Sequence, residues 1–318
     1  MATQGRDPHH GGGIERCCAK LNLSLAVIAR RADGFHEIES LMVPVSLSDT
    51  IRGRRRKEPG VGLRVRFAGP LATRPDAMRA HDVPADGSNL VVRAVAALAS
   101  AAGVSEGLEI DLVKRIPAGA GLGGGSSDAA AGLRLAARLW RLDWPAARLA
   151  ELGAGIGSDI PWFCAGVPAI ARGRGELLEA VPRLPALAAV IACPATGLST
   201  AAVYAGCRPD PSRRGEAARL AVALARGGLE AARPFLHNTL EDAARSLSPD
   251  VGTVLTALET AGGFAPRLTG SGSACFALAR SVREARGVAA RLHAATHGLC
   301  PAVFVVRLAP QPGRVAAA

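Results

Sequence analysis

A glycine-rich stretch at residues 117–131, with the sequence PAGAGLGGGSSDAAA, constrains the fold of this chain more than any other segment. A backbone with so few β-carbons can turn tightly around an anion. The alanine-rich run that follows predicts a helix, whose first N–H groups and positive dipole end would face the same anion. Before the loop, Leu108, Ile110 and Leu112 alternate as in a half-buried strand. The order strand, glycine loop, helix predicts a phosphate-binding site rather than a flexible linker.

Two familiar phosphate-binding loops do not fit this stretch. A P-loop requires a lysine and then serine or threonine after its last glycine, whereas Gly125 is followed directly by Ser126. The dinucleotide-binding fingerprint is partly matched by Gly119, Gly121 and Gly124. That fingerprint also needs an acidic residue about 20 positions later, at the end of a second strand, and residues 139–141 are helical in character. Neither fold explains the loop.

The length of 318 residues, 49% of them hydrophobic, is sufficient for a buried core and for two domains. The longest apolar stretches are interrupted well before about 18 residues, so no transmembrane helix is expected. Residues 1–16 are polar and glycine-rich and lack the apolar centre of a signal peptide, which predicts a disordered N-terminal extension. Seven cysteines, an odd number without paired spacing, indicate reduced thiols rather than disulfides or zinc ligands. We therefore expect a cytoplasmic protein.

The net charge of +11 raises the question of a nucleic-acid partner. Nearly all of this charge comes from arginine spread along the chain, and only residues 52–57 form a dense block. Aromatic residues make up 3% of the chain, so stacking platforms for single strands are scarce. Arginine is better interpreted as the general surface cation, although a positive field would favour an anionic substrate. We expect no nucleic-acid or membrane partner, and a monomer or weak homodimer.

Lysine is rare enough to be informative, because the chain has only Lys20, Lys57 and Lys114. Lys57 belongs to the arginine block and Lys114 to the strand before the glycine loop, which predicts surface or substrate-rim positions for both. Lys20 lies in an otherwise apolar strand over residues 19–28. Lys20, Asn22, Ser24 and Ala26 alternate there with aliphatic residues. The alternation predicts that Lys20 and Asn22 point at a common target.

The order of the other predicted elements favours an α+β fold with an antiparallel sheet in the second half. Strands are predicted over residues 38–47, 63–67, 188–193, 275–279 and 302–308. Helices are predicted over residues 89–102, 126–141, 144–152, 216–225, 251–261 and 282–294. A composition change near residues 167–175 predicts a first domain over residues 17–168 and a second over residues 169–318. A glycine-rich turn at residues 153–161 presents Asp159, and a second loop of glycines and hydroxyls covers residues 269–273.

Taken together, these segments resemble the GHMP kinases, the superfamily of galactokinase, homoserine kinase and mevalonate kinase. The phosphate loop from Pro117 to Ser127 matches the signature of that superfamily. Residues 19–25, 31–37 and 157–163 resemble more specifically the branch that phosphorylates 4-diphosphocytidyl-2-C-methyl-D-erythritol. The matching passages follow one another in family order over almost the whole chain from about Cys17.

The resemblance implies a two-domain GHMP kinase fold. Its N-terminal ATP-binding domain would resemble ribosomal protein S5, and its C-terminal domain would be a ferredoxin-like α/β sandwich. The implied activity is transfer of the ATP γ-phosphoryl group to the 2-hydroxyl of 4-diphosphocytidyl-2-C-methyl-D-erythritol in the non-mevalonate isoprenoid pathway. ATP and Mg²⁺ are the implied cofactors.

The resemblance also assigns expected roles to residues. Asp159 would accept the hydroxyl proton, with Lys20 as its catalytic partner. The expected substrate-binding residues are Asn22, Phe35, His36 and Thr200. The expected ATP-binding residues are Pro117, Ala118, Gly119, Ala120, Gly121, Leu122, Gly123, Gly124, Gly125, Ser126 and Ser127, and Ser127 is also the expected protein ligand of Mg²⁺. A second phosphate-facing loop, or alternatively a simple turn, comprises Thr269, Gly270, Ser271, Gly272 and Ser273.

Departures from the family pattern leave alternatives open. Phe35 stands where tyrosine is usual, and Thr196 stands where a second aromatic residue is common, so stacking of cytosine on one side or on two sides is undecided. Asp159 could cap the turn at Pro161, Lys20 could extend to the surface, and His36 could be a surface turn residue. The rival functions are a GHMP kinase for homoserine or a sugar alcohol, and a non-catalytic nucleic-acid-binding protein.

Overall fold

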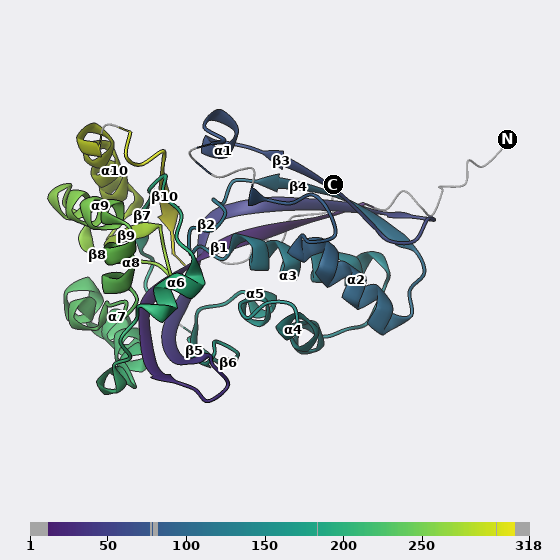
Figure 1. The fold of residues 1–318 in the computed structure, drawn as a ribbon, viewed down its shortest axis with the longest axis horizontal. Coiled ribbons are helices and arrows are strands. Elements are labelled where there is room, and N and C mark those ends of the chain that lie inside the picture. Colours follow the sequence, from purple (N-terminus) through teal and green to yellow (C-terminus); the bar gives the residue numbers. More distant parts are fainter. Residues whose placement is uncertain (1–11, 77, 79–81, 183, 297, 309–318) are drawn as a thin grey trace.

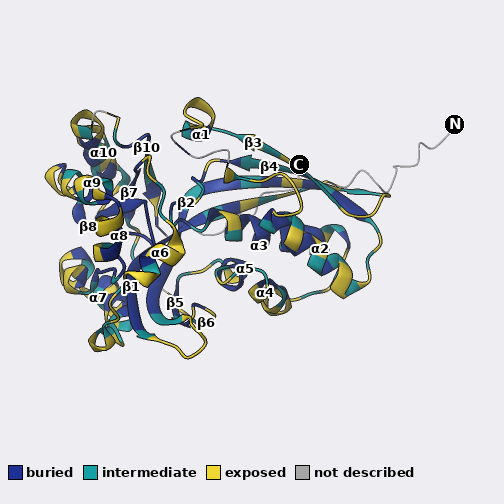
Figure 2. Cartoon of the chain, in the orientation of Figure 1, coloured by how far each residue is buried: buried dark blue, intermediate teal, exposed yellow. Residues whose placement is uncertain are grey.

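Two β-sheets, joined through the long strands β1 (Gly13–Arg30) and β2 (His36–Arg56), organise this protein in a computed structural model (Figure 1). The structure describes residues 12–308 except 77, 79–81, 183 and 297. Buried residues follow the strands and the inner sides of the helices (Figure 2). Within the described residues, every helix is too short or too polar to span a lipid bilayer.

The first sheet is built around β2, which is paired along both of its edges. Its other strands are β1, β3 (Val61–Phe67), β4 (Gly107–Lys114), β5 (Ala169–Gly173) and β6 (Leu177–Ala180). β1 runs antiparallel to β2 over nearly its whole length, while β4 and β5 share the opposite edge of β2. β3 pairs parallel to β4, and β6 pairs antiparallel to β5. Because β1 and β2 are long, the first sheet extends from the glycine loop to the second half of the chain.

Helices from the first half cover one face of this sheet. They are α2 (Leu90–Ala102), α3 (Gly124–Leu139), α4 (Ala146–Ala154) and α5 (Ile160–Ala165), and a short α1 (Pro70–Thr73) follows β3. α3 begins directly at the glycine loop and packs on β1 and β2. The small, fully buried side chains of Ala129, Ala130 and Ala131 let this helix lie close to the sheet. The close packing fixes the position of the glycine loop relative to β1.

The second sheet has the strand order β10–β7–β9–β8, with all neighbours antiparallel. Its strands are β7 (Ala188–Cys193), β8 (Phe264–Leu268), β9 (Cys275–Ala279) and β10 (Ala302–Arg307). Its helices are α6 (Thr200–Ala205), α7 (Glu216–Ala232), α8 (Glu241–Leu247), α9 (Pro249–Thr260) and α10 (Val282–Thr296), with short 3₁₀ helices η2 (Pro211–Arg213) and η3 (Arg233–Phe235). α9 and α10 pack on the sheet. This arrangement confirms the expected α+β class and the ferredoxin-like second half.

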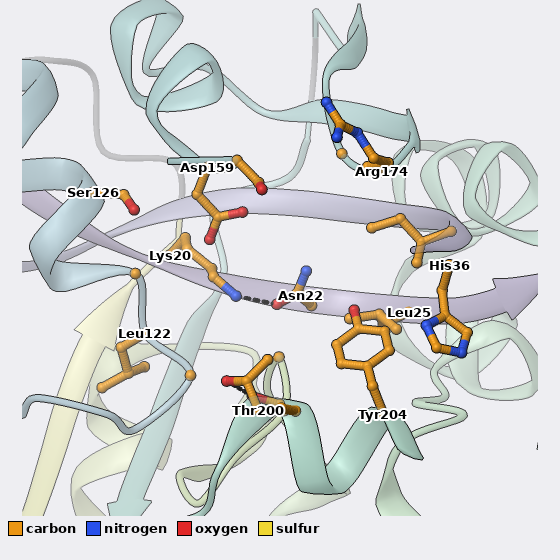
Figure 3. A pocket seen from close by; sticks show the side chains of 18 of the residues that line it. Lys20, Asn22, Leu25, His36, Leu122, Ser126, Asp159, Arg174, Thr200 and Tyr204 are labelled. Atoms are coloured by element: carbon orange, nitrogen blue, oxygen red, sulfur yellow. Dashed lines mark hydrogen bonds between the residues drawn. The ribbon is translucent and has the colours of Figure 1, made fainter. Parts of the chain in front are cut away.

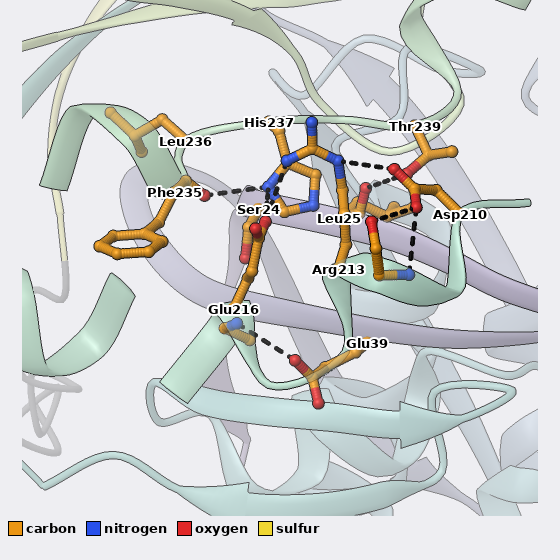
Figure 4. A network of polar contacts seen from close by, with 12 residues as sticks. Ser24, Leu25, Glu39, Asp210, Arg213, Glu216, Phe235, Leu236, His237 and Thr239 are labelled. Atoms are coloured by element: carbon orange, nitrogen blue, oxygen red, sulfur yellow. Dashed lines mark hydrogen bonds and ion pairs between the residues drawn. The ribbon is translucent and has the colours of Figure 1, made fainter. Parts of the chain in front are cut away.

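Polar contacts attach the turn end of β1 and β2 to the second half of the chain (Figure 4). The carboxylate of Glu39 accepts hydrogen bonds from the backbone N–H groups of Gly215 at 2.8 Å and Ala217 at 3.1 Å, so it caps the start of α7. The backbone N–H of Leu25 donates to the carbonyl of His237 at 2.9 Å. One buried apolar cluster also joins these parts, and it contains residues of β1, β2, α7 and the second sheet. The turn that carries Phe35 and His36 is thereby fixed to the second half.

Several boundaries differ from the expected ones. β1 begins at Gly13, so residues 13–16 of the expected disordered extension are part of a strand, and residues 1–11 lie outside the described residues. β5 and β6 follow the expected domain boundary at residue 169, yet they belong to the first sheet. We therefore propose that the boundary lies between β6 and β7. These two short strands have no periodicity long enough to identify them in the sequence.

The predicted long elements are present. The helices predicted over residues 89–102, 126–141, 144–152, 216–225, 251–261 and 282–294 correspond to α2, α3, α4, α7, α9 and α10. The strands predicted over residues 38–47, 63–67, 188–193, 275–279 and 302–308 correspond to parts of β2 and to β3, β7, β9 and β10. All seven cysteines are free, as expected. Five of them, including Cys17 and Cys193, are buried among apolar side chains.

Candidate active site

A cavity of about 1290 Å³ lies where the two halves of the chain meet, and it brings together most of the expected site residues (Figure 3). The glycine loop forms one end of the cavity, and the turn between β1 and β2 forms the other. Every residue from Pro117 to Ser126 lines the cavity. The other expected residues that line it are Lys20, Asn22, Phe35, His36, Asp159, Thr200, Gly270 and Ser271.

The glycine loop adopts a conformation that side chains would oppose. Gly119, Gly121 and Gly123 have φ values of 63°, 76° and 71°, in the left-handed region that favours glycine. Gly123 is the residue before α3 and has no side chain to cap it, and within the described part of the chain no other side chain caps the first N–H groups of that helix. These donors are therefore left for an anion at the end of the cavity. The geometry matches the phosphate-binding site predicted from the sequence.

Backbone hydrogen bonds fix the glycine loop to both halves of the chain. The carbonyl of Leu122 accepts from the backbone N–H of Lys20 at 3.0 Å. The carbonyl of Ala120 accepts from the backbone N–H of Ala274, in the second half, at 3.2 Å. The loop is consequently held at a fixed distance from the strand that carries Lys20.

The loop of residues 269–273 packs directly against the glycine loop. A β-carbon added to Gly121 would lie 2.2 Å from the carbonyl oxygen of Thr269, so only glycine fits there. The Thr269 hydroxyl accepts from the backbone N–H of Asn22 at 3.1 Å, which ties this loop to β1. Gly270 and Ser271 line the cavity, while the other three residues of the loop are not among those that do. The phosphate-facing alternative is therefore favoured for Gly270 and Ser271 alone.

A buried ionic cluster, formed by Lys114, Asp49 and Asp128, lies beneath the glycine loop. The Lys114 ammonium donates to a carboxylate oxygen of Asp128 at 2.7 Å and also to Asp49. Asp49 in turn accepts from the backbone N–H groups of Ile116, at 2.8 Å, and Arg115. The expectation that Lys114 is a surface or rim residue is wrong, because its side chain is only 3% exposed. The cluster joins the strand before the loop to the helix after it.

The charges of this cluster do not balance, and the pKa values reflect this. Burial alone would lower the pKa of Lys114, but the two carboxylates outweigh it and raise that pKa. Burial raises the pKa of Asp128 to about 8, with the neighbouring Asp49 acting in the same direction and Lys114 against it. One oxygen of Asp128 also has no hydrogen-bond partner among the described residues. A proton on Asp128 relieves the excess negative charge of the cluster.

Replacement of Asp128 by asparagine is expected to flatten the dependence of stability on pH. A carboxyl whose pKa is raised on folding contributes stability that is fully present below about pH 4 and is lost as pH rises through about 8. Asparagine keeps the shape and cannot lose a proton. The melting temperature of the unaltered protein should fall more steeply between pH 5 and 9 than that of Asp128→Asn, as measured by thermal unfolding; parallel curves would contradict the raised pKa.

Lys20 and Asp159 face the same part of the cavity from different elements. The Lys20 side chain, only 4% exposed, donates from its ammonium to the side-chain oxygen of Asn22. The Asn22 amide donates to the Ser40 hydroxyl at 2.8 Å, which fixes its orientation. Burial lowers the pKa of Lys20, and the charge of Asp159 opposes that shift. Figure 3 shows the Asp159 carboxylate beside the Lys20 side chain. The alternative in which Lys20 extends to the surface is wrong.

Asp159 is available for chemistry because it has no structural partner at its helix. It immediately precedes α5, but its side chain makes no capping hydrogen bond there. The alternative in which Asp159 caps the turn at Pro161 is therefore wrong. The glycine-rich connection between α4 and α5 and the proline in the first turn of α5 place this carboxylate at the cavity wall.

The polar face predicted along β1 changes side after Asn22. The pairing of β1 with β2 shifts register between Asn22 and Ser24, as in a β-bulge, and an extra residue reverses the side on which later side chains lie. Leu25 therefore lines the cavity with Lys20 and Asn22. Ser24 does not line the cavity, and its hydroxyl accepts a hydrogen bond from the backbone N–H of Leu41 at 3.3 Å.

Aromatic side chains form the end of the cavity away from the glycine loop. The rings of His36 and Tyr204 lie 5.1 Å apart between centroids. The pKa of His36 is lowered by partial burial and by Arg30, which favours a neutral ring at pH 7. Phe35 is 52% exposed at the rim, and the guanidinium of Arg174 lies 4.8 Å from its ring centroid. His36 thus lines the cavity and is not simply a surface turn residue. This end can accept a flat, partly polar ring.

Tyr204 is an aromatic cavity residue that sequence reasoning missed, as it missed Arg30 and Arg174. The expected position for a second aromatic residue, Thr196, instead bonds to Asp250 and is not among the cavity-lining residues. α6 brings Tyr204 into the cavity one turn after Thr200, whose hydroxyl lies 2.8 Å from that of Ser271. The sequence did contain a signal for Tyr204. It lies four residues after Thr200, so the two share a helix face, and it is the only tyrosine of the chain.

Ser127 does not lie where the expected Mg²⁺ ligand would face the cavity. Its side chain is buried, and its hydroxyl donates to the backbone carbonyl of Cys18 at 2.7 Å. Ser127 does not line the cavity, whereas Ser126 does. The expectation for Ser127 is corrected accordingly: it joins α3 to β1, and Ser126 supplies the hydroxyl at the cavity. Adjacent helix residues point in directions about 100° apart, so only one of the two serines can face the phosphate.

Comparison with known proteins places this geometry among kinases. Family models match the GHMP kinases N terminal domain over residues 89–167 and the GHMP kinases C terminal domain over residues 220–297. The chain is 37% identical over 290 residues to the 4-diphosphocytidyl-2-C-methyl-D-erythritol kinase of Shouchella clausii, covering 91% of this chain and 92% of that protein.

Solved structures agree with this similarity. A crystal structure of 4-(cytidine 5'-diphospho)-2C-methyl-D-erythritol kinase is similar with a TM-score of 0.74 and 34% identity, over 94% of this chain and all of that one. The homoserine kinase of Cytophaga hutchinsonii is similar with a TM-score of 0.68 at 18% identity, over 98% of this chain and 97% of that one, which shows a shared fold alone.

Proposed function

The chain belongs to the GHMP kinases and, within them, to the 4-diphosphocytidyl-2-C-methyl-D-erythritol kinases, and from this we propose its reaction. It transfers the γ-phosphoryl group of ATP to the 2-hydroxyl of 4-diphosphocytidyl-2-C-methyl-D-erythritol, a step of the non-mevalonate isoprenoid pathway, and gives the 2-phosphate and ADP. The single observation that carries this assignment is the 37% identity to such a kinase over 91% of the chain.

The shape of the cavity favours this substrate over the rival substrates. A substrate with a cytosine ring uses the end formed by His36 and Tyr204, and it reaches Lys20 and Asp159 with its other end. Homoserine has no ring to occupy the aromatic end. The similarity to a homoserine kinase, at 18% identity, concerns the fold alone. We therefore expect selectivity for the cytidine-containing substrate.

The reaction requires positioning and neutralisation of charge more than covalent catalysis. The unpaired N–H groups at the start of α3 bind the ATP phosphates. Asp159 accepts the proton of the 2-hydroxyl as the oxygen forms its bond to the γ-phosphorus and the bond to the β–γ bridging oxygen breaks. Lys20 supplies positive charge beside the transferring group and is itself held by Asn22. Its distance to the glycine loop is set by the hydrogen bond to Leu122.

Mg²⁺ is expected to accompany ATP, and the residues at the cavity fit a partial protein site. Among the described residues no group of three or more acidic, histidine or cysteine side chains could hold a metal ion. Magnesium often keeps most of its contacts to phosphate and water, with one or two protein oxygens. Ser126 would provide one such oxygen, because it lines the cavity with the glycine loop. The ion would neutralise charge on the phosphates.

A coupled assay of ADP release tests the proposed function directly. The protein is supplied with ATP, Mg²⁺ and, separately, 4-diphosphocytidyl-2-C-methyl-D-erythritol, homoserine or mevalonate. We expect turnover with the first substrate alone, and a new phosphate monoester resonance in the ³¹P NMR spectrum of the product. Turnover with homoserine alone would contradict the proposal. Tight, salt-sensitive binding of nucleic acid without any ATP turnover would favour the non-catalytic alternative.

A further inference from the structure

Basic side chains are few along the cavity, and their distribution is uneven. Among the described residues that line it, the lysines and arginines are Lys20, Arg30 and Arg174. Lys20 lies at the reacting end, hydrogen-bonded to Asn22. Arg30 and Arg174 lie toward the other end, since Arg30 acts on the pKa of His36 and Arg174 packs on the Phe35 ring. The aromatic end therefore has two positive charges of its own.

Within the described residues these two arginines, unlike their sequence neighbours, form no ion pair, although the charge of Arg174 acts on nearby Asp33. Arg31, next to Arg30, pairs with Asp33 at 3.0 Å, and Arg172, two residues before Arg174, pairs with Glu39 at 3.1 Å. Within the described residues, neither Arg30 nor Arg174 has a carboxylate oxygen within 4.0 Å of its guanidinium nitrogens. Their charges remain available to an anion that enters the cavity.

A tight turn of the backbone orients the side chain of Arg174. Gly173 and Gly175 have φ values of 70° and 116°, and the backbone N–H of Arg174 donates to the Glu176 carboxylate at 2.5 Å. This tight turn follows β5, on the opposite wall of the cavity from Tyr204 (Figure 3). A side chain that is held by a turn and by stacking loses less freedom when it binds a ligand.

On the basis of the proposed function, we infer that Arg174, assisted by Arg30, binds the diphosphate of the substrate and so distinguishes cytidine diphosphate compounds from cytidine itself. A substrate with its base at His36 and Tyr204 and its hydroxyl at Asp159 places its diphosphate between them. The N–H groups of the glycine loop are occupied by ATP. Arginine suits this task, because its planar guanidinium donates two parallel hydrogen bonds to phosphate oxygens.

Binding of cytidine and of CDP, measured by titration calorimetry with a non-hydrolysable ATP analogue and Mg²⁺ occupying the ATP site, tests this inference. Arg174→Gln is expected to weaken CDP binding about tenfold, equivalent to about 1.4 kcal/mol, and to leave cytidine binding unchanged. Arg30→Gln should weaken CDP binding in the same direction. Arg286→Gln, which removes an exposed arginine of α10, is the matched control and should change neither affinity.

Kinetics should separate binding from chemistry in the same variants. Arg174→Gln is expected to raise KM for the cytidine diphosphate substrate about tenfold, with kcat and KM for ATP unchanged, because the contact is made equally before and during the reaction. Equal CDP affinity in Arg174→Gln and the unaltered protein would overturn the inference, and so would an equal loss of cytidine affinity, since Arg174 would then act only through Phe35. Failure of the unaltered protein to bind either ligand would overturn the proposed function together with the inference.

Discussion

Turnover by the Asp159→Asn variant is expected to be about 1,000-fold below that of the unaltered enzyme, because a general base contributes about 10²- to 10⁴-fold. Asparagine has nearly the shape of aspartate but cannot accept the proton of the substrate hydroxyl. Asp159 makes no capping hydrogen bond to α5, so the substitution removes no structural contact at that helix. The affinity for ATP should stay within about twofold, because the N–H groups at the start of α3 are unchanged.

Single-turnover kinetics with ATP and the cytidyl substrate measure this effect, and fluorescence titration with an ATP analogue measures the binding. Asp143→Asn is a matched control, because Asp143 is exposed, lies in the connection between α3 and α4 and does not line the cavity. It should retain full activity. Activity of Asp159→Asn within about tenfold of the unaltered enzyme would eliminate Asp159 as the base.

The Gly123→Val variant is expected to lose at least about 100-fold in kcat/KM for ATP, since a misplacement of about 1 Å can cost this much. A β-carbon at Gly123 would lie 2.7 Å from the Phe163 ring and 3.1 Å from the side chain of Lys20. The φ of 71° is also one that a β-branched residue rarely adopts. The expected damage is therefore a displaced loop and a displaced Lys20, in addition to obstruction of the phosphate site.

Gly103→Val separates backbone strain from damage to the site. Gly103 follows α2 with a similar φ of 64°, and a β-carbon there would meet nothing within 4 Å. This control should lose stability, by about 1–2 kcal/mol for the left-handed conformation, and keep its ATP kinetics. Thermal unfolding and steady-state kinetics on both variants provide the comparison. Unchanged kcat/KM for ATP in a folded Gly123→Val variant would contradict the structural account of the loop.

The sequence was sufficient for the features that depend on local pattern. The glycine loop, the strand that carries Lys20 and the turn that carries Asp159 were all identified from residue types and spacing. The long helices and strands were identified for the same reason, since a period of 3.6 or 2 is visible over ten residues. These elements already contain both proposed catalytic side chains.

The features that the sequence did not reveal depend on contacts between distant residues. Lys114 was expected near the surface because its partner Asp49 is 65 residues away in the chain. The reversal of faces after Asn22 depends on a register shift against β2, which no property of β1 alone predicts. Ser126 and Ser127 are adjacent and chemically identical, so only the helix direction decides which one faces the cavity.

The central claim is that Lys20 and Asp159 meet at the terminal phosphate of ATP held by the glycine loop. A crystal structure of the protein with a non-hydrolysable ATP analogue, Mg²⁺ and 4-diphosphocytidyl-2-C-methyl-D-erythritol tests it most directly. We expect the Lys20 ammonium within about 3 Å of a γ-phosphate oxygen, and an Asp159 carboxylate oxygen within hydrogen-bond distance of the substrate 2-hydroxyl, in line with the γ-phosphorus. A γ-phosphate that lies away from both side chains, or a 2-hydroxyl beyond the reach of Asp159, would contradict the account.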